Sequence, residues 1–553
     1  MSERINIAIA QINPTVGAIS DNAARMQMAR AEAAAAGADL VVFGELVICG
    51  YPPEDLVLKP AFQHAVETAV AALAAATTDD GPAMLIGAPW RVDGMLYNAA
   101  LMLEGGEVAA VRLKHQLPNY GVFDEKRVFA SGPLPGPIAF RGVRLGVMVC
   151  EDMWYGDVAE CLDESGAEIY VVLNGSPFEA DKQDDRLNFA VSRVTESNLP
   201  IIYVNLVGGQ DELVFDGGSF VIGADRSLRA KAPEFEEELL ITEWRRAGEA
   251  WVCEAGPIAK SLEIPDAIYR ALVLGLRDYV GKNGFPGVLI GLSGGIDSAL
   301  SAVVAVDALG ADRVHCVMMP SPYTSQESLD DAAECARLLG IKLDTVNIGP
   351  AMTAFDEMLS PLLEDHAADT TEENIQARSR GLSLMALSNK LGYMVLSTGN
   401  KSEMSVGYAT LYGDMCGGYS VLKDVYKTTV YDITRRRNEA CPKDCLGPDG
   451  LSVPENIITK APTAELKPDQ KDQDTLPPYD ELDAILSHLI EEDMAMEDIV
   501  ARGFDKSTVH RIWRMLDLAE YKRRQAPPGV KTTRRAFGRD RRYPITNGFR
   551  GDV

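Results

Sequence analysis

The stretch GLSGGIDSA, residues 291–299, constrains the fold of this chain more than any other segment. It follows the apolar run VLI and opens into LSAVVAVDAL, which is the pattern of a strand, a tight glycine-rich loop and a helix. The backbone N–H groups of such a loop, together with the positive end of the helix, bind phosphate. The lysine of the G-x-x-x-x-G-K-[ST] phosphate loop is missing, so the loop predicts a different kind of phosphate site.

The residues after this loop predict a doubly wound α/β domain. The apolar runs HCVMMPS, IKLDTVNIG and GYMVLSTGN are separated by helical segments such as QESLDDAAECARLLG. That alternation is typical of a parallel sheet with helices on both faces, and it predicts a domain over 265–525. The remaining segment, 526–553, is locally basic, and we expect it to form either a contact or a solvated tail.

The first part of the chain predicts a second α/β domain. INIAIAQI, ADLVVFGEL, AMLIGAPW and RLGVMVCED read as strands, and NAARMQMARAEAAAAG reads as a helix. We expect a sandwich of sheets with helices outside over 1–245. The segment 246–264 is acidic and then rich in turns, so we interpret it as a linker.

Composition excludes several classes of function. The net charge of −28 opposes general binding to nucleic acid or to an anionic membrane. No apolar stretch is long enough to cross a bilayer, and the beginning of the chain does not resemble a signal peptide. The nine cysteines are scattered and odd in number, which favours a reducing, cytoplasmic location, and the six histidines form no zinc-binding pattern.

Three polar residues lie at the ends of predicted strands, where α/β proteins place their chemistry. Cys150 is a candidate nucleophile, Glu45 a candidate base, and Lys114 a candidate partner for an oxyanion that also lowers the thiol pKa. His115 is the alternative base, but neighbours on an extended segment face opposite sides, so only one of 114 and 115 enters the site. A cysteine at the end of an apolar strand is more often a small buried residue, so both interpretations stay open.

The sequence motifs around these residues resemble those of a known family. GELVICGYPPEDL, KHQLPNYGVFDEKRVF and GVMVCEDMW resemble the nitrilase, or carbon–nitrogen hydrolase, family over about the first 245 residues. The resemblance implies an α-β-β-α sandwich with Glu45 as general base, Lys114 as partner of the oxyanion and thiolate, and Cys150 as nucleophile. It implies that Glu125 is a second active-site glutamate. Many members have proline before the first glutamate where this chain has glycine, but the glutamate itself is kept.

The glutaminase branch of that family supplies further expectations. NGSPFEADKQDDR resembles the segment that holds the substrate there. The resemblance implies that Tyr120, Ser176 and Lys182 bind glutamine, whose carboxylate and ammonium need polar partners. The alternative for NGSP is a simple exit from a strand into a turn.

The SGGIDS string resembles the ATP pyrophosphatase, or PP-loop, family. The resemblance implies that pyrophosphate is the leaving group when a carboxylate attacks the α-phosphate of ATP, with Mg²⁺ supplying positive charge and Asp297 as its oxygen ligand. A bare glycine pair would be weak support, but the full string between a strand and a helix is specific. The ATP-binding residues implied in this loop are Gly291, Leu292, Ser293, Gly294, Gly295, Ile296, Asp297 and Ser298.

Later motifs distinguish among PP-loop enzymes. ENIQARSRGLSLMALSNKLG, LSTGNKSEMSVGYATLYGDMCGGYSVLKDVYKT and KAPTAELKPDQKDQDTLPPY resemble the NAD synthetase family. Glu403 and Lys427 could instead be solvated helix charges, and Cys441 and Cys445 of CPKDC are best interpreted as two incidental loop thiols. The resemblance implies Thr398 and Lys427 at ATP, Glu403 at Mg²⁺ and the dinucleotide, and Asn374, Asp414 and Lys522 at the dinucleotide.

Together the two parts resemble the glutamine-dependent NAD synthetase family. The resemblance implies that one half frees ammonia from glutamine and the other consumes it at an acyl-adenylate of deamido-NAD, giving NAD, AMP, pyrophosphate and glutamate. It also implies an ammonia channel and a homo-oligomer, to which the basic tail could contribute. Three other hypotheses are an amidotransferase with another acceptor, a tRNA-modifying PP-loop enzyme, and a synthetase whose first half is only a scaffold.

Overall fold

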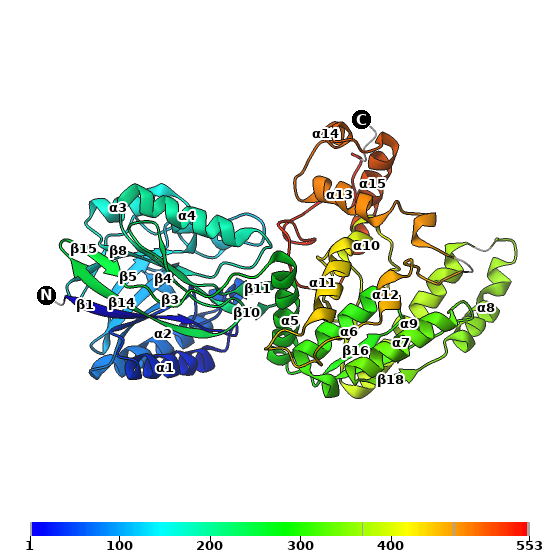
Figure 1. Ribbon diagram of the computed structural model, residues 1–553, viewed down its shortest axis with the longest axis horizontal. Coiled ribbons are helices and arrows are strands. Elements are labelled where there is room, and N and C mark those ends of the chain that lie inside the picture. Colours follow the sequence, from blue (N-terminus) through cyan, green and yellow to red (C-terminus); the bar gives the residue numbers. More distant parts are fainter. Residues whose placement is uncertain (1–2, 368, 468–469, 550–553) are drawn as a thin grey trace. The chain divides into compact units, whose positions relative to one another are not determined.

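A computed structural model describes residues 3–367, 369–467 and 470–549 of the chain. The fold divides into two compact units, 1–263 and 264–553, which are described separately below (Figure 1). The first unit contains two large sheets and the second contains one. No helix among the residues just given has the length and apolar character that crossing a bilayer requires.

The larger sheet of the first unit has seven strands in the order β15-β14-β1-β2-β3-β4-β5. Its central strands carry apolar residues on both faces because both faces are covered. The strands β1, β2 and β3 are parallel to one another, whereas the remaining pairs are antiparallel. The strands are β1 (Arg4–Gln11), β2 (Leu40–Phe43), β3 (Ala83–Val92), β4 (Met95–Glu104), β5 (Glu107–Leu113), β14 (Glu238–Ala247) and β15 (Ala250–Cys253).

The second sheet of this unit has six strands in the order β13-β12-β9-β8-β7-β6, and a two-stranded ribbon, β10-β11, accompanies it. The strands β7, β8 and β9 are parallel, so their carboxyl ends meet at one edge. The strands are β6 (Ile138–Phe140), β7 (Val143–Val149), β8 (Ile169–Asn174), β9 (Ile201–Asn205), β10 (Val207–Gln210), β11 (Leu213–Asp216), β12 (Phe220–Ile222) and β13 (Leu228–Lys231).

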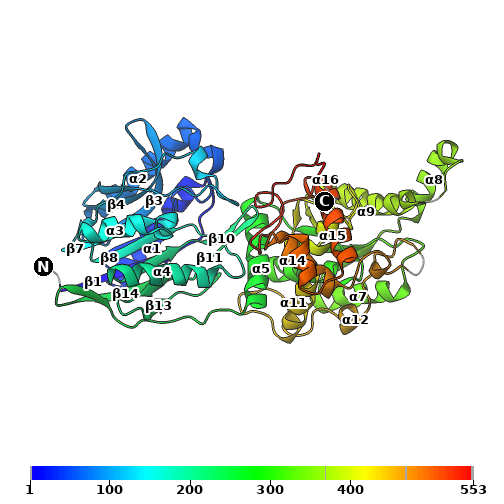
Figure 2. The same ribbon diagram turned by 90° about the horizontal axis from the view of Figure 1, so that it is seen from above.

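Helices cover the outer face of each sheet of the first unit, as the two views of the ribbon show (Figures 1 and 2). One apolar core lies between the sheets, a second under α1 and α2, and a third under α3 and α4. This order of layers confirms the predicted α-β-β-α sandwich. The helices are α1 (Ile19–Ala35), α2 (Pro60–Ala75), α3 (Gly156–Glu164) and α4 (Lys182–Ser197), with short 3-10 turns η1 (Glu54–Leu58), η2 (Ala76–Thr78), η3 (Glu125–Arg127) and η4 (Cys150–Met153).

The segment interpreted as a linker begins inside the larger sheet. Residues up to Ala247 belong to β14, and β15 pairs with it so that Cys253 lies opposite Trp244. Trp251 and Cys253 are 1% exposed because these alternating apolar residues face the core between the sheets. The acidic composition of the segment concealed this short alternation, and the boundary between the units falls after residue 263.

The second unit is built on a parallel sheet of five strands in the order β18-β17-β16-β19-β20, which confirms the predicted doubly wound arrangement. The order reverses at β16, the strand that leads into the glycine-rich loop. The strands are β16 (Val288–Gly291), β17 (Val314–Met318), β18 (Lys342–Thr345), β19 (Met394–Ser397) and β20 (Tyr419–Ser420).

Helices of two kinds surround this sheet. Those next to it follow the strands, and a separate helical layer packs its own apolar core beyond α10. The helices are α5 (Ile264–Lys282), α6 (Ile296–Leu309), α7 (Gln326–Leu339), α8 (Gly349–Leu363), α9 (Thr370–Leu391), α10 (Lys401–Val406), α11 (Lys427–Glu439), α12 (Glu455–Thr459), α13 (Tyr479–Ile490), α14 (Met496–Ala501), α15 (Lys506–Leu518) and α16 (Glu520–Arg523), with η5 (Ala311–Arg313) and η6 (Asp472–Asp474).

The described part of the basic tail is packed into this unit, and its last residues, 550–553, lie outside the described ranges. Lys531 and Thr532 are buried, and the N–H group of Thr532 donates to Asp424 Oδ2 at 2.7 Å. Lys401 is fully buried and its ammonium also pairs with Asp424 at 2.8 Å. The tail therefore supplies part of a buried polar network, and the alternative of a solvated extension is wrong for these residues.

Candidate active sites

Four residues predicted from the sequence meet in the first unit. Glu45 follows β2, Lys114 follows β5, Glu125 begins η3, and Cys150 begins η4 directly after β7. All four side chains are at most 5% exposed. The ammonium of Lys114 donates to Glu45 Oε1 at 2.7 Å and to Glu125 Oε1 at 2.8 Å. Two strand ends of the larger sheet and the turn η3 thus bring one cation between two carboxylates, and β7 of the second sheet adds the cysteine.

Burial is the largest influence on the pKa values of Glu125 and Cys150 in this cluster. It raises the pKa of Glu125 to about 7, although Lys114 opposes the change. It also raises the pKa of the Cys150 thiol well above its ordinary value, with Glu45 adding to the rise and Lys114 opposing it. Lys114 lowers the pKa of the thiol, as expected, but desolvation and Glu45 outweigh the ammonium, so the net pKa is raised. A thiol in this state needs a base before it can act as a nucleophile.

The backbone at Cys150 is strained in a way that exposes its side chain to the site. Its φ of 46° lies in the left-handed region, which a non-glycine residue rarely adopts. Asp152 holds the turn because its carboxylate accepts from the N–H groups of Val149 at 3.0 Å, His115 at 3.0 Å and Gln116 at 2.8 Å. The same carboxylate therefore joins the cysteine turn to the segment that follows Lys114.

His115 does not take part in this cluster. Its Nδ1 lies 2.7 Å from the carbonyl oxygen of Gly132, and its Nε2 lies 3.8 Å from Asp157. Lys114 enters the site and His115 faces away from it, as the alternation of an extended segment requires.

Three groups that sequence reasoning missed complete the cluster. Asn98 Nδ2 donates to Glu45 Oε1 at 2.7 Å, and the N–H group of Gly175 donates to Glu45 Oε2 at 2.9 Å. Tyr51 donates its hydroxyl proton to Glu125 Oε1 at 2.8 Å. Tyr51 stands inside the quoted motif GELVICGYPPEDL, which could have drawn attention to it, whereas Asn98 in β4 carried no signal in the sequence.

The three residues expected to bind glutamine occupy different positions around Cys150. Tyr120 is 53% exposed, and its hydroxyl donates to Glu151 Oε2 at 3.0 Å. Ser176 is buried, and its Oγ accepts from the guanidinium of Arg186 at 3.2 Å. Lys182 begins α4 and pairs with Glu179 at 3.3 Å. Glu151, which follows the cysteine, is a further acidic group there that sequence reasoning did not single out.

In the second unit the glycine-rich loop has the predicted strand–loop–helix setting. Gly294 has a φ of 82°, and a Cβ there would lie 2.3 Å from the carbonyl oxygen of Ser328, so only glycine fits. Ser293 Oγ accepts from the N–H group of Gly295 at 3.2 Å, and Ser298 Oγ donates to the carbonyl of Gly295 at 2.9 Å. The loop's own hydroxyls thus hold it in shape at the amino end of α6.

One buried cation joins two predicted ligands of Mg²⁺. The ammonium of Lys427 contacts Asp297 Oδ2 and lies 3.3 Å from Glu403 Oε1. Burial raises the pKa of Glu403 to about 8 while Lys427 opposes the rise. Asn400 Nδ2 holds the other oxygen of Asp297 at 2.8 Å. The alternative of solvated helix charges is wrong for Lys427, which is 2% exposed, and for Glu403, which lies among these groups.

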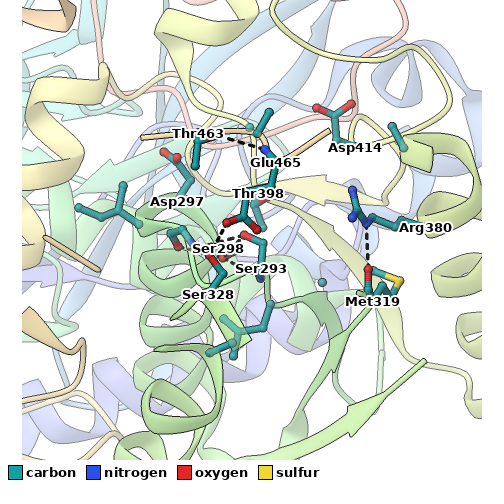
Figure 3. A pocket seen from close by; sticks show the side chains of 18 of the residues that line it. Ser293, Asp297, Ser298, Met319, Ser328, Arg380, Thr398, Asp414, Thr463 and Glu465 are labelled. Carbon is teal, nitrogen blue, oxygen red and sulfur yellow. Dashed lines mark hydrogen bonds between the residues drawn. The ribbon is translucent and has the colours of Figure 1, made fainter. Parts of the chain in front are cut away.

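These side chains line a cavity of about 290 Å³ in the second unit, shown in Figure 3. Glu403 and Asp414 line it, and so do most of the residues expected at ATP. The residues expected at ATP that line the cavity are Gly291, Leu292, Ser293, Gly295, Ile296, Asp297, Ser298, Thr398 and Lys427. Gly294 supports the loop from beneath, against Ser328.

Arg380 of α9 is a cavity residue that sequence reasoning missed, although it stands in the quoted motif ENIQARSRGLSL. Its Nε donates to the carbonyl of Met319 at 3.1 Å (Figure 3). Burial lowers the pKa of its guanidinium, and the carboxylates of Glu465 and Asp414 oppose that change. Its Nε makes the one hydrogen bond of this guanidinium within the described ranges, which leaves the other nitrogens for an anionic group in the cavity.

Three residues expected at the dinucleotide gather around the segment 407–414. Asn374 Oδ1 accepts from the hydroxyl of Thr410 at 3.0 Å, and Asp414 Oδ1 accepts from the N–H group of Thr410 at 2.6 Å. Lys522 donates to the carbonyls of Gly407 at 2.7 Å and Ala409 at 2.6 Å. Asp414 lines the cavity, whereas Asn374 and Lys522 hold this segment from behind.

The cysteine pair of CPKDC lies apart from the cavity. Cys441, Cys445 and Asp307 place one ligand atom each within 4.8 Å of one another. The carboxylate of Asp307 is already paired, since Arg437 Nε donates to Oδ2 at 2.6 Å and its second nitrogen donates to Oδ1 at 3.0 Å. This carboxylate serves an ion pair between α6 and α11, which gives the cluster a structural explanation.

Comparisons with known proteins match each part of the chain to a family. Residues 6–250 match the carbon-nitrogen hydrolase family, and residues 268–526 match the NAD synthase family. The chain is 50% identical to the glutamine-dependent NAD(+) synthetase of Rhodobacter capsulatus over 100% of both chains. It is 46% identical to that of Acinetobacter baylyi over 99% of both chains.

A solved structure is similar over the same length. The glutamine-dependent NAD+ synthetase of Acinetobacter baumannii, in complex with adenosine diphosphate, is 44% identical, covers 100% of both chains and has a TM-score of 0.79. The likeness therefore extends over both units rather than over one of them. This chain belongs to the family of glutamine-dependent NAD(+) synthetases.

Proposed function

We propose that this protein makes NAD by amidating deamido-NAD with ammonia taken from glutamine, at the expense of ATP. The observation that carries the proposal is the buried ammonium of Lys114 between Glu45 and Glu125, beside the strained turn of Cys150. Such a cluster in one unit supports amide hydrolysis, and the phosphate loop in the other supports use of ATP. The names of the full-length relatives support the same pairing.

In the first unit, Glu45 takes the proton of the Cys150 thiol as sulfur attacks the amide carbon of glutamine. The ammonium of Lys114 stabilises the oxyanion that forms, because a fixed charge in a buried site is more effective than solvent. The proton passes to the leaving nitrogen and ammonia departs. Water then hydrolyses the thioester, with Glu125 and Glu45 as the acid–base groups within reach, and glutamate is released. Tyr120, Ser176 and Lys182 are the proposed partners of the ammonium and carboxylate of glutamine.

In the second unit, the carboxylate of deamido-NAD attacks the α-phosphorus of ATP and pyrophosphate leaves. Ammonia then attacks the acyl carbon, AMP departs, and NAD is formed. The loop 291–298 holds the phosphates through backbone N–H groups and the end of α6. Lys427 and Thr398 face the same cavity, and Asp414 and Glu403 are the proposed contacts to the dinucleotide, with Asn374 and Lys522 behind them.

The side chains of Asp297 and Glu403 are suited to hold a magnesium ion. Both are carboxylates, the hard oxygen ligands that Mg²⁺ prefers, and burial raises the pKa of Glu403 to about 8, so this site gains from added positive charge. When bound, the ion would neutralise the phosphates of ATP. The protein's own contribution is Lys427, whose buried ammonium supplies a second positive charge beside the same carboxylates.

We further propose that ammonia passes from the first site to the second without equilibrating with solvent, and that copies of the chain form a homo-oligomer. The chemical reason for transfer is that ammonia in water at neutral pH is mostly ammonium, which is not a nucleophile. A protected path keeps it neutral and near the acyl-adenylate.

The test is to incubate the protein with ATP, Mg²⁺, deamido-NAD and glutamine labelled with ¹⁵N at the amide, and to measure labelled NAD by mass spectrometry. Unlabelled ammonium added in excess should dilute the label little if the ammonia is transferred internally. Cys150→Ala should abolish synthesis from glutamine and preserve synthesis from added ammonium. Equal synthesis by this variant from both nitrogen sources would show that the first unit is only a scaffold, and NAD formation from neither source in the wild type would remove the proposal.

A further inference from the structure

Asn98 contacts the two buried glutamates and the backbone of the lysine that pairs with both of them. It lies in β4, its side chain is fully buried, and its backbone carbonyl oxygen accepts from the backbone N–H group of Lys114 at 2.9 Å. Its amide nitrogen donates to Glu45 Oε1 at 2.7 Å and lies 3.4 Å from Glu125 Oε2. One asparagine thus touches the lysine and both carboxylates.

The two carboxylates compete for one ammonium. Lys114 lies 2.7 Å from Glu45 and 2.8 Å from Glu125, so its charge does not distinguish between them. Two carboxylates at one buried cation share a proton, since both cannot ionise at equal cost. A base for the thiol must be the one that is left ionised.

The neutral donors decide this competition. Glu45 accepts from the N–H group of Gly175 at 2.9 Å, and Glu125 accepts from the hydroxyl of Tyr51 at 2.8 Å, so these two contacts offset each other. Asn98 favours one of the two carboxylates, because its Nδ2 lies 2.7 Å from Glu45 Oε1 and 3.4 Å from Glu125 Oε2. A donated hydrogen bond favours the charged form of a carboxylate.

The other end of the same amide indicates that packing alone does not explain Asn98. Its Oδ1 is buried and has no hydrogen-bond partner in the described part of the chain. An unsatisfied buried carbonyl is costly, and an apolar residue of similar size would avoid that cost. The amide is therefore placed for its N–H groups.

We propose that Asn98 is a positioning residue whose short hydrogen bond selects Glu45, rather than Glu125, as the base for Cys150. This inference rests on the proposed glutaminase activity of the first unit. The charged and titratable groups that face Glu45 are Lys114, Glu125, Tyr51, Cys150 and Glu151. None of them is altered in the variants below, so a change in the pH profile is assigned to the amide.

The experiment measures kcat/KM for glutamine hydrolysis against pH in the full-length protein with Asn98→Leu and Asn98→Asp. Loss of one hydrogen bond to a carboxylate should move the acidic limb upward by about one pH unit. At a pH below that limb the Leu variant should be about tenfold slower than wild type, and above it the two rates should converge. The Asp variant keeps the shape of the side chain and adds a like charge, so its limb should move further.

Asn22→Leu is the matched control. Asn22 is equally buried in the same unit, but its side chain bonds only to backbone groups of Thr15 and Ile48. It should leave the acidic limb in place even if it lowers the melting temperature. NAD synthesis from added ammonium, which does not use Cys150, should be unchanged in every variant.

Two outcomes would overturn the inference. Either an equal loss of kcat/KM at every pH in both Asn98 variants, or no loss at all, would leave Asn98 with only a structural role. If the Leu variant does not fold, the pH profile of the Asp variant decides, since that substitution alters charge rather than shape. Failure of the glutaminase proposal would give a different result: the Cys150→Ala variant would then keep the wild-type rate of NAD synthesis from glutamine.

Discussion

Replacing Glu125 with Gln should stabilise the protein at alkaline pH while it removes glutamine hydrolysis. The wild-type carboxyl has a pKa of about 7 in the folded state, against an ordinary value of 4.5, and burial is the main cause. A carboxyl whose pKa is higher when folded binds its proton more tightly there than in the unfolded chain. Its contribution to stability is therefore full below about pH 4.5 and is lost as the pH rises through 7.

The size of the effect follows from that difference in pKa. At about 1.4 kcal/mol for each pH unit, it corresponds to about 3 kcal/mol of unfolding free energy lost between pH 4.5 and pH 7. This figure already includes the attraction of Lys114, because the ammonium lowers the pKa that burial raises. Glutamine has no proton to lose, so Glu125→Gln should match wild type near pH 4 and exceed its stability by about 3 kcal/mol at pH 8.

The assay is urea unfolding at several pH values, followed by tryptophan fluorescence. Four of the five tryptophans lie in the first unit, so the signal reports mainly on the unit that holds Glu125. They are Trp90, Trp154, Trp244 and Trp251. Titrating groups that do not interact with Glu125 are shared by the two proteins, so their contributions cancel in the difference. A stability difference that is the same at pH 4 and pH 8, or a variant that is less stable at pH 8, would refute the reasoning.

Other predictions concern the second unit. Lys427→Met should lower NAD synthesis from both glutamine and ammonium by about a hundredfold or more, because Asp297 and Glu403 lose their buried cation; steady-state kinetics with each nitrogen source would check this. Arg380→Met should raise the KM of ATP or of deamido-NAD with glutamine hydrolysis by the first unit unchanged, and an unaltered KM for both would contradict the assignment of its guanidinium to a substrate anion. Asp424→Asn should lower the free energy of unfolding of the second unit by about 3 kcal/mol, since it removes one of the two carboxylates that pair with the buried ammonium of Lys401; hydrogen exchange of that unit would measure it.

The sequence by itself determined which chemistry this protein carries and the order of its elements. Strand, glycine-rich loop and helix around residues 291–299 required no tertiary information, since backbone geometry and helix dipoles act locally. Glu45, Lys114 and Cys150 could be found because each ends a predicted strand inside a recognisable motif. The two α/β domains followed from the periodicity of apolar residues, which reflects burial.

Only the tertiary structure decided which groups set the charge of those residues. Asn98 and Tyr51 reach the carboxylates from β4 and from the segment after β2, and a single sequence holds no record of such long-range contacts. The net pKa of Cys150 also depends on the fold: Lys114 lowers it as expected, but desolvation, which depends on everything packed around the thiol, raises it further. The basic composition of the tail left both a contact and a solvated extension open, and the structure decides for a contact because the N–H group of Thr532 meets a carboxylate more than a hundred residues away. Local patterns fix elements and motifs, but burial and charge at a site belong to the whole fold.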